Sequence, residues 1–321
     1  MRNLKYRNQS DTYAAMTFTI IRALLILLAV LPINVSAQTP ATSQVKAVLV
    51  TGASSGIGRS ITERLTADGY FVYAGARKDE DLQALAAIEN VQPLRLDVTK
   101  QQDIDAAVET VTKAGRGLYG LVNNAGVFTI GSVADTKTEE FDLVMSVNIY
   151  GPWRVTRAFA PLIIASHGRI TNIGSINGIF TPPTMGAYGM SKHAIEGFTD
   201  ALAQELAPAG VQVSVVEPGS YKTEIIDNAV RRSGTGSQMV DFVSRLKDPG
   251  EVAAVVEQAL FDPNPKRRYL VVPNAQQAEI TIKTQIQQLV QLNEGQLYTY
   301  DRDTLVKMLD EALSQSRPRI Q

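Results

Sequence analysis

The sequence predicts an α/β fold in which a doubly wound parallel sheet of about seven strands carries helices on both faces. From Val45 onward, short apolar runs rich in β-branched residues alternate with segments whose apolar residues recur at helical spacing. Such alternation implies right-handed crossovers between parallel strands. A glycine-rich turn, TGASSGIG, joins the first run directly to the first helical segment, and nothing between Val45 and Val272 resembles a domain-splitting linker.

The strands are the apolar runs, because their β-branched residues suit a sheet that is buried on both faces. The first run, VKAVLVTG, ends in a glycine of the turn, and the last, RRYLVV, closes the α/β domain. In order, strands are expected at residues 45–52, 70–77, 91–98, 118–126, 168–175, 211–219 and 267–272.

The helices lie between these runs. In the first helix, Ile57, Ile61 and Leu65 recur at helical spacing, and Gly69 provides a natural stop. The polar, glycine-containing stretch from Tyr221 to Lys247 is expected to be a mobile loop over the site. In order, helices are expected at residues 56–70, 79–90, 101–115, 139–167, 186–207 and 249–260, with amphipathic helix over most of 275–317.

The N-terminal segment differs from the rest of the chain. Four basic residues precede nine consecutive apolar residues at 23–31, and a Val-x-Ala sequence ends at Ala37. This pattern is typical of a secretory signal peptide, and nine residues fall short of the ~20 that span a bilayer. Residues 14–37 could alternatively form an uncleaved membrane anchor, with Arg22 inside it. The sequence therefore predicts an exported or membrane-anchored protein.

Three parts of the chain follow from these patterns. Residues 1–45 form the signal or anchor with a linker, residues 46–272 form the α/β domain, and residues 273–321 form a helical C-terminal extension. The sequence alone does not assign a role to the extension.

Composition excludes several classes of function. The 321 residues contain no cysteine, which excludes disulfides, zinc–thiolate sites and cysteine nucleophiles. They contain two histidines, His167 and His193, too few to favour an imidazole metal site or a Ser-His-Asp triad. The formal net charge of −1 gives no global field that would attract nucleic acid. We therefore expect no metal, no nucleic acid and a small-molecule substrate.

The glycine turn predicts a dinucleotide site. Gly52 can turn the chain off the strand, Gly56 lets the backbone approach a pyrophosphate, and Gly58 lets helix and strand pack closely. The N–H groups at the helix start favour a phosphate there, and the first strand-to-helix junction is the expected context. The turn residues expected to bind the dinucleotide are Gly52, Ser54, Ser55, Gly56, Ile57 and Gly58.

The residue at the end of the second expected strand indicates whether the cofactor is NAD or NADP. Proteins that bind NAD usually place an acidic residue there for the ribose 2′-hydroxyl, whereas an arginine accommodates the 2′-phosphate of NADP. This strand ends AGAR, so Arg77 favours NADP as the cofactor. The alternative is that Arg77 is only a solvated cation.

With these features in place, the chain resembles the short-chain dehydrogenase/reductase family, whose members have a Rossmann fold. The resemblance covers about residues 46–272 and is nearest to the retinol and hydroxysteroid dehydrogenase branch, because of PGSYKT and YGMSKHAIEGF. Asn124 is interpreted only as a strand-to-loop residue. The further cofactor contacts that the resemblance implies are Asp97, Val98, Asn123, Ala125, Gly126, Pro218, Gly219 and Thr223, together with Tyr188 and Lys192.

Tyr188 and Lys192 lie one helical turn apart, which suits proton transfer. A hydride that leaves an alcohol carbon requires the hydroxyl proton to leave too, and an ammonium group near a phenol is expected to lower its pKa from about 10. Tyr188 is therefore predicted to be the general acid/base. The resemblance implies that Lys192 also binds the nicotinamide ribose, that Ser175 orients the substrate oxygen, and that Asn148 holds a relay water. Ser175 as a cap and Asn148 as an ordinary helix residue are the alternatives.

The implied reaction is the NADP(H)-dependent interconversion of an alcohol and its ketone or aldehyde, and we expect a homo-oligomer. A nucleotide-sugar epimerase or dehydratase is an alternative function, but the spacing of the glycines in the turn argues against it. A non-catalytic NADP(H)-binding sensor or scaffold is another, although such proteins typically lose the tyrosine or lysine. Apolar residues after strands four to six suggest a hydrophobic substrate, namely Phe128, Phe180, Pro182, Met185 and Tyr221.

Overall fold

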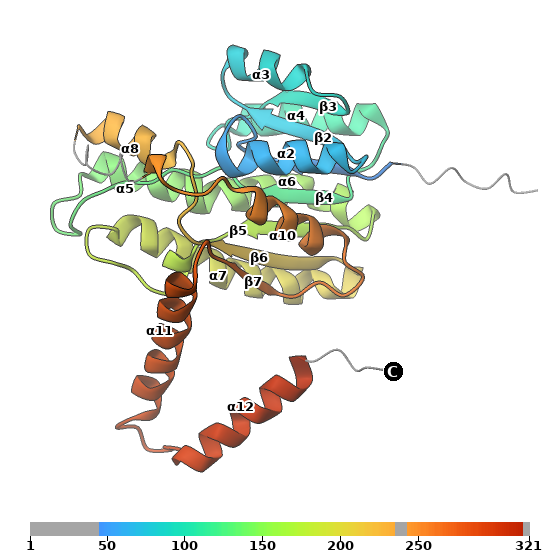
Figure 1. Cartoon of the computed structure of the whole chain (residues 1–321). Coiled ribbons are helices and arrows are strands. Elements are labelled where there is room, and N and C mark those ends of the chain that lie inside the picture. Colours follow the sequence, from blue (N-terminus) through green and yellow to red (C-terminus); the bar gives the residue numbers. More distant parts are fainter. Residues whose placement is uncertain (1–44, 235–242, 317–321) are drawn as a thin grey trace, which may run out of the picture. The chain divides into compact units, whose positions relative to one another are not determined.

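The computed structural model describes residues 45–234 and 243–316, and Figure 1 shows how their elements are arranged. Seven parallel strands form one sheet in the order β3-β2-β1-β4-β5-β6-β7, which confirms the predicted fold. The strands are β1 (Ala47–Val50), β2 (Phe71–Ala76), β3 (Val91–Arg95), β4 (Gly120–Asn123), β5 (Arg169–Ile173), β6 (Gln212–Pro218) and β7 (Arg268–Val271).

Helices cover both faces of the sheet. One apolar core packs α2, α3 and α10 on one face, and the other packs α4, α6 and α7 on the opposite face (Figure 1). The main helices are α2 (Gly56–Ala67), α3 (Asp79–Ala86), α4 (Gln101–Ala114), α5 (Thr138–Met145), α6 (Gly151–Ala165), α7 (Gly186–Leu206), α8 (Ile225–Ser233), α10 (Gly250–Phe261), α11 (Ala275–Asn293) and α12 (Arg302–Ser316). Short turns of helix are η1 (Ser146–Tyr150), η2 (Ile176–Gly178) and η3 (Ala207–Ala209).

The strand order places a crevice at the middle of the sheet. β1 pairs with β2 on one side, where Val48 is in register with Val72, and with β4 on the other, where Val48 is in register with Gly120. The connections from β1 and from β4 therefore leave the sheet side by side in opposite directions. In open α/β sheets, ligands bind outside the carboxyl ends of the strands at such a reversal.

Two elements differ from the sequence-based expectation, and a third agrees with it. The helix expected at 139–167 is α5 and α6 joined by η1, a π-helical turn. The stretch expected to be a polar loop contains α8, a helix of nine residues. The extension forms two helices, α11 and α12, which agrees with the helix expected over most of 275–317.

The predicted signal or anchor at residues 14–37 lies outside the described residues. Within the part of the chain that the structure describes, no helix combines the length and apolar character that crossing a membrane requires.

Candidate active site

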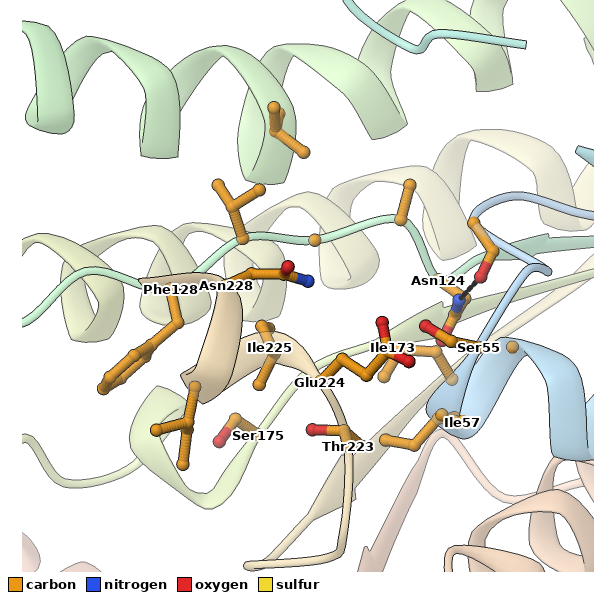
Figure 2. Close-up of a pocket in the computed structure, with 18 of the residues that line it drawn as sticks. Ser55, Ile57, Asn124, Phe128, Ile173, Ser175, Thr223, Glu224, Ile225 and Asn228 are labelled. Carbon is orange, nitrogen blue, oxygen red and sulfur yellow. Dashed lines mark hydrogen bonds between the residues drawn. The ribbon is translucent and has the colours of Figure 1, made fainter. Parts of the chain in front are cut away.

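A cavity of about 430 Å³ lies at the carboxyl ends of the strands, lined by the loops that leave β1 to β6. It gathers all of the predicted site residues except Asn123 and Asn148. Figure 2 shows Ser55, Ile57 and Asn124 toward one end of it and Phe128 and Ser175 toward the other. The predicted residues that line the cavity are Gly52, Ser54, Ser55, Gly56, Ile57, Gly58, Arg77, Asp97, Val98, Ala125, Gly126, Ser175, Tyr188, Lys192, Pro218, Gly219 and Thr223.

The glycine turn packs too tightly for side chains at two of its positions. Gly52 has a φ of +65°, in the left-handed region that favours glycine, and a Cβ added there would lie 2.9 Å from the Cα of Ala125. A Cβ on Gly58 would lie 2.1 Å from the carbonyl oxygen of Gly52. At the N-cap of α2, the Ser55 side chain makes no capping hydrogen bond. The first N–H groups of α2 are therefore available to an anion at the cavity wall.

Thr51 and Asn124 fasten the glycine turn to the loop after β4. The Thr51 hydroxyl accepts hydrogen bonds from the backbone N–H groups of Asn124 at 2.9 Å and Ala125 at 3.0 Å. The Asn124 side-chain amide donates to the carbonyl oxygens of Thr51 at 2.8 Å and Gly52 at 3.0 Å. Sequence reasoning missed both roles, since Asn124 was interpreted only as a strand-to-loop residue.

Asn123 does not reach the cavity. Its side-chain amide donates to the Thr156 hydroxyl at 2.9 Å and to the Asn172 side-chain oxygen at 2.8 Å, in a buried polar network beneath the sheet. Asn172 in turn donates to Thr199 at 2.9 Å. Successive residues of a strand point to opposite faces, so the neighbouring asparagines have different surroundings. The Asn123 side chain is therefore engaged in a network that joins β4, β5, α6 and α7, and the predicted contact of this residue with a cofactor stays a prediction.

Arg77 and Asp97 line the end of the cavity beyond β2 and β3. Burial alone would raise the pKa of Asp97, but hydrogen bonds from Thr99 and the charge of Arg77 lower it below its ordinary value. Asp97 accepts from the Thr99 hydroxyl at 2.7 Å. Arg77 itself is exposed and forms no ion pair with any described residue. Its guanidinium is thus available to an anionic group at this end.

Ser175, Tyr188 and Lys192 meet at the centre of the cavity. The Ser175 hydroxyl is close enough to the Tyr188 phenol to affect its pKa, and the Lys192 Nζ lies 5.6 Å from the centre of the Tyr188 ring. The ammonium group donates to the carbonyl oxygen of Ile173 at 2.8 Å. This brings a proton donor, a second hydroxyl and a cation to one point of the crevice.

The pKa of Tyr188 differs from the sequence-based expectation. Burial raises it to about 12, and the hydrogen bond with Ser175 offsets only part of this effect. Burial also lowers the pKa of Lys192 to about 8, opposed by the nearby charge of Glu196. The expected lowering of the tyrosine pKa is therefore wrong for the protein without ligand, because the sequence cannot show how far both groups are removed from water.

Asn148 lies in η1, behind the cavity wall. Its side-chain oxygen accepts from the backbone N–H of Val127 at 2.8 Å, and its amide donates to the carbonyl oxygen of Val127 at 2.9 Å and to the Ser191 hydroxyl at 3.0 Å. Ser191 precedes Lys192 on α7. A π-helical turn is often found at functional sites, and here it links the loop after β4 to the helix that carries the lysine.

One side of the cavity is apolar. The Phe128 ring packs edge-on against Tyr188, with ring centres 4.9 Å apart, and Met185 and Tyr221 also line the cavity as expected. Phe180 and Pro182, which were expected there, do not line it. Sequence reasoning missed α8, which contributes Ile225, Ile226, Asn228 and Arg231 to the lining.

A polar contact holds α8 beside this apolar side. Arg232 donates to the carbonyl oxygen of Phe128 at 2.6 Å and forms an ion pair with Glu140 at 3.2 Å. Glu140 also accepts from the Thr129 hydroxyl at 3.1 Å. The helix is therefore joined to the loop that carries Phe128.

Comparison with known proteins agrees with this arrangement. Residues 46–233 match the family model for short chain dehydrogenases. The bovine mitochondrial D-beta-hydroxybutyrate dehydrogenase is 39% identical over 186 residues, 55% of this chain and 54% of that protein, so the chain matches about half the length of this relative. An NADPH-dependent 3-dehydrocapnine reductase of Ornithobacterium rhinotracheale is 35% identical over 249 residues, 70% of this chain and 87% of the relative.

A solved structure extends the likeness to three dimensions. The structure of a short chain dehydrogenase from Burkholderia cenocepacia in complex with NADP superimposes with a TM-score of 0.64 at 26% identity, covering 77% of this chain and 95% of that one. The family model, the sheet order and the grouping of Ser175, Tyr188 and Lys192 agree, and the chain belongs to the short-chain dehydrogenase family.

Proposed function

We propose that the protein is an NADP(H)-dependent oxidoreductase that interconverts an alcohol and its ketone or aldehyde, with a hydrophobic substrate. The observation that carries this proposal is that Ser175, Tyr188 and Lys192 line one cavity whose other end is the glycine turn. NADP(H) supplies or accepts the hydride when it is bound.

The residues present fit such a cofactor. The glycine turn leaves no space for side chains at Gly52 and Gly58, so bare backbone and the start of α2 face a pyrophosphate. At the far end, Arg77 suits a 2′-phosphate, and a carboxylate in its place would repel that group. A relative named as NADPH-dependent and a solved relative in complex with NADP support the same choice.

In the direction of reduction, the substrate carbonyl oxygen lies between the two hydroxyls. Tyr188 gives its proton to that oxygen while the carbonyl carbon receives the hydride, and the Ser175 hydroxyl donates a hydrogen bond to the same oxygen. The raised pKa keeps the phenol protonated before the reaction. The Lys192 ammonium stabilises the phenolate that the transfer leaves behind, and a proton from solvent restores the tyrosine.

Asn148 supports this group from behind. By binding Val127 and Ser191, its side chain holds the loop after β4 and the part of α7 next to Lys192. Its oxygen keeps a second lone pair with which it can hold the relay water that the family resemblance implies. We assign Asn148 to this positioning and relay role.

The substrate class follows from the apolar side. Phe128, Met185, Ile225, Ile226 and Leu246 surround the cavity beyond Tyr188, so an aliphatic or aromatic ketone gains more from burial there than a sugar does.

The test is turnover by the full chain with NADPH and a panel of hydrophobic ketones and aldehydes, followed at the absorbance band of reduced nicotinamide. Tyr188→Phe is expected to lower kcat by about 10²- to 10⁴-fold, the usual contribution of a general acid. NADPH binding, measured by fluorescence, is expected to persist in that variant. Tyr150→Phe, at an exposed position, is the matched control. Near-normal rates in Tyr188→Phe would show that the mechanism is wrong.

A further inference from the structure

Helix α11 packs with its polar side inward. Thr281 is fully buried and Gln277, Thr284 and Gln288 are half-buried, at the four- and three-residue spacing of one helix face. On the remaining surface Ile282, Ile286 and Leu289 are each more than half exposed. This is the reverse of an ordinary surface helix, whose apolar residues face the core. Burying a polar face is unfavourable unless its groups find partners, so the partners of this face are informative.

Gln277 binds the backbone of the loop after β6. Its side-chain oxygen accepts from the Ser220 N–H at 2.9 Å. A Cβ on Gly219 would lie 2.1 Å from the same oxygen, so the amide rests directly against the glycine backbone. Gly219 and Ser220 both line the cavity. Gln277 is itself held at the start of α11, where its N–H donates to the Asn274 side chain at 3.0 Å.

Gln288 binds the loop after β5, three turns further along the same face. Its side-chain amide donates to the carbonyl oxygen of Ile179 at 3.1 Å. Ile179 ends the turn η2, which begins directly after Ser175 and places Ile176 and Asn177 in the cavity lining. One helix therefore contacts the backbone of two separate walls of the same cavity.

We propose that α11 is a strap along two walls of the cavity, in which Gln277 positions the Gly219–Ser220 backbone for cofactor binding and Gln288 positions the wall that follows Ser175. Both are positioning residues and act through the backbone that they hold. The helix lies beyond residues 46–233, the part that matches the family model. The proposal rests on the proposed function for the identity of the cofactor.

The first test needs no cofactor. Amide hydrogen exchange at Ser220 is measured in wild type, Gln277→Leu and Gln277→Glu, with Gln287→Leu as a control at an exposed position of the same helix. Loss of the acceptor in Gln277→Leu is expected to speed exchange at Ser220 by about tenfold, the equivalent of one hydrogen bond. Gln277→Glu keeps an acceptor of the same reach and is expected to restore protection. Equal exchange in wild type and Gln277→Leu would overturn the strap.

The second test separates cofactor from substrate effects. In Gln277→Leu, the Kd for NADPH from fluorescence titration is expected to rise about 5- to 10-fold, with the KM for ketone nearly unchanged. In Gln288→Leu, the ketone KM is expected to rise while the NADPH Kd stays near that of wild type. Unchanged Kd in Gln277→Leu would overturn the positioning role. Failure of wild-type protein to bind NADPH would instead refute the proposed function.

Discussion

Lys192 is expected to make the folded protein less stable than an apolar side chain at the same position would. Its side chain is almost fully buried, and burial lowers its pKa from 10.5 to about 8. A pKa difference of this size corresponds to ~3 kcal/mol of differential interaction between the charged and neutral forms. At pH 7 the charged form of Lys192 is therefore ~3 kcal/mol less favourable in the folded protein than in the unfolded chain. The strain is tolerated at a position that the proposed mechanism needs charged.

The variant Lys192→Met tests this reasoning. Methionine has a similar length and no charge, so it removes the burial penalty. It also removes the hydrogen bond to the carbonyl oxygen of Ile173, which is worth ~1 kcal/mol. The expected net result at pH 7 is a gain of ~2 kcal/mol in the free energy of unfolding, together with loss of turnover. Replacement of buried charges by apolar groups of similar volume is often stabilising to this degree.

The pH dependence gives the sharper measurement. Because the pKa is lower in the folded state, the penalty is complete below about pH 8 and disappears as the pH rises through 10.5. Urea denaturation of both proteins at pH 7 and pH 9.5 is expected to show the advantage of Lys192→Met shrinking by ~2 kcal/mol. Comparing the two proteins at each pH cancels the other titrating groups. A difference that stays constant, or a variant that is less stable at pH 7, would refute the reasoning.

Two further predictions concern Arg77, which lines the cavity, and Glu217, a buried carboxyl residue of β6. Arg77→Glu is expected to raise the KM for NADPH by about 10- to 100-fold, since a carboxylate repels a 2′-phosphate, and to leave the KM for NADH unchanged or lower. Steady-state kinetics with both cofactors measures the two KM values. Equal changes in the KM for NADPH and the KM for NADH would contradict the prediction. Burial, together with the charge of Glu196, raises the pKa of Glu217 to about 8, against the opposing charge of Arg268. The stability that the neutral carboxyl contributes is therefore complete below pH ~4.5 and is lost as the pH rises through 8. Between pH 6 and pH 9, Glu217→Gln is expected to lose less stability than wild type does, by ~1 kcal/mol or more. Denaturation curves of both proteins at the two pH values measure this difference.

The regular part of the fold could be predicted because each signal was local. The first strand ends at the glycine turn, and the spacing of Ile57, Ile61 and Leu65 predicts a helix that the structure places at Gly56–Ala67. Gly52 and Gly58 were assigned a tight turn and close packing, and the left-handed φ and the 2.1 Å approach confirm both. In these cases the presence of glycine alone indicates a backbone conformation or a close approach that other residues do not allow.

The rest depended on surroundings that the sequence does not show. Asn123 and Asn124 are the same residue type at the end of one strand. Because successive side chains of a strand point to opposite faces, one of them lines the cavity and the other does not. The charged residues of α8 suggested a polar loop, yet its isoleucines line the cavity. The direction of the pKa shift at Tyr188 followed from burial, which is a property of the folded chain.

The bonds between Thr51 and Asn124 have a consequence for the order of events during synthesis. They join positions 73 residues apart, and they exist only once β4 has paired beside β1. A nascent chain that has just completed its first three strands already carries the entire glycine turn, held to β2 by the bond from the Ala53 N–H to the Gly75 carbonyl oxygen but not yet held by Asn124. The glycine turn therefore reaches its final structure only after β4 pairs with β1, and contacts between segments far apart in the sequence form slowly in folding. Until that pairing, the turn lacks the two hydrogen bonds that the Thr51 hydroxyl accepts from the loop after β4.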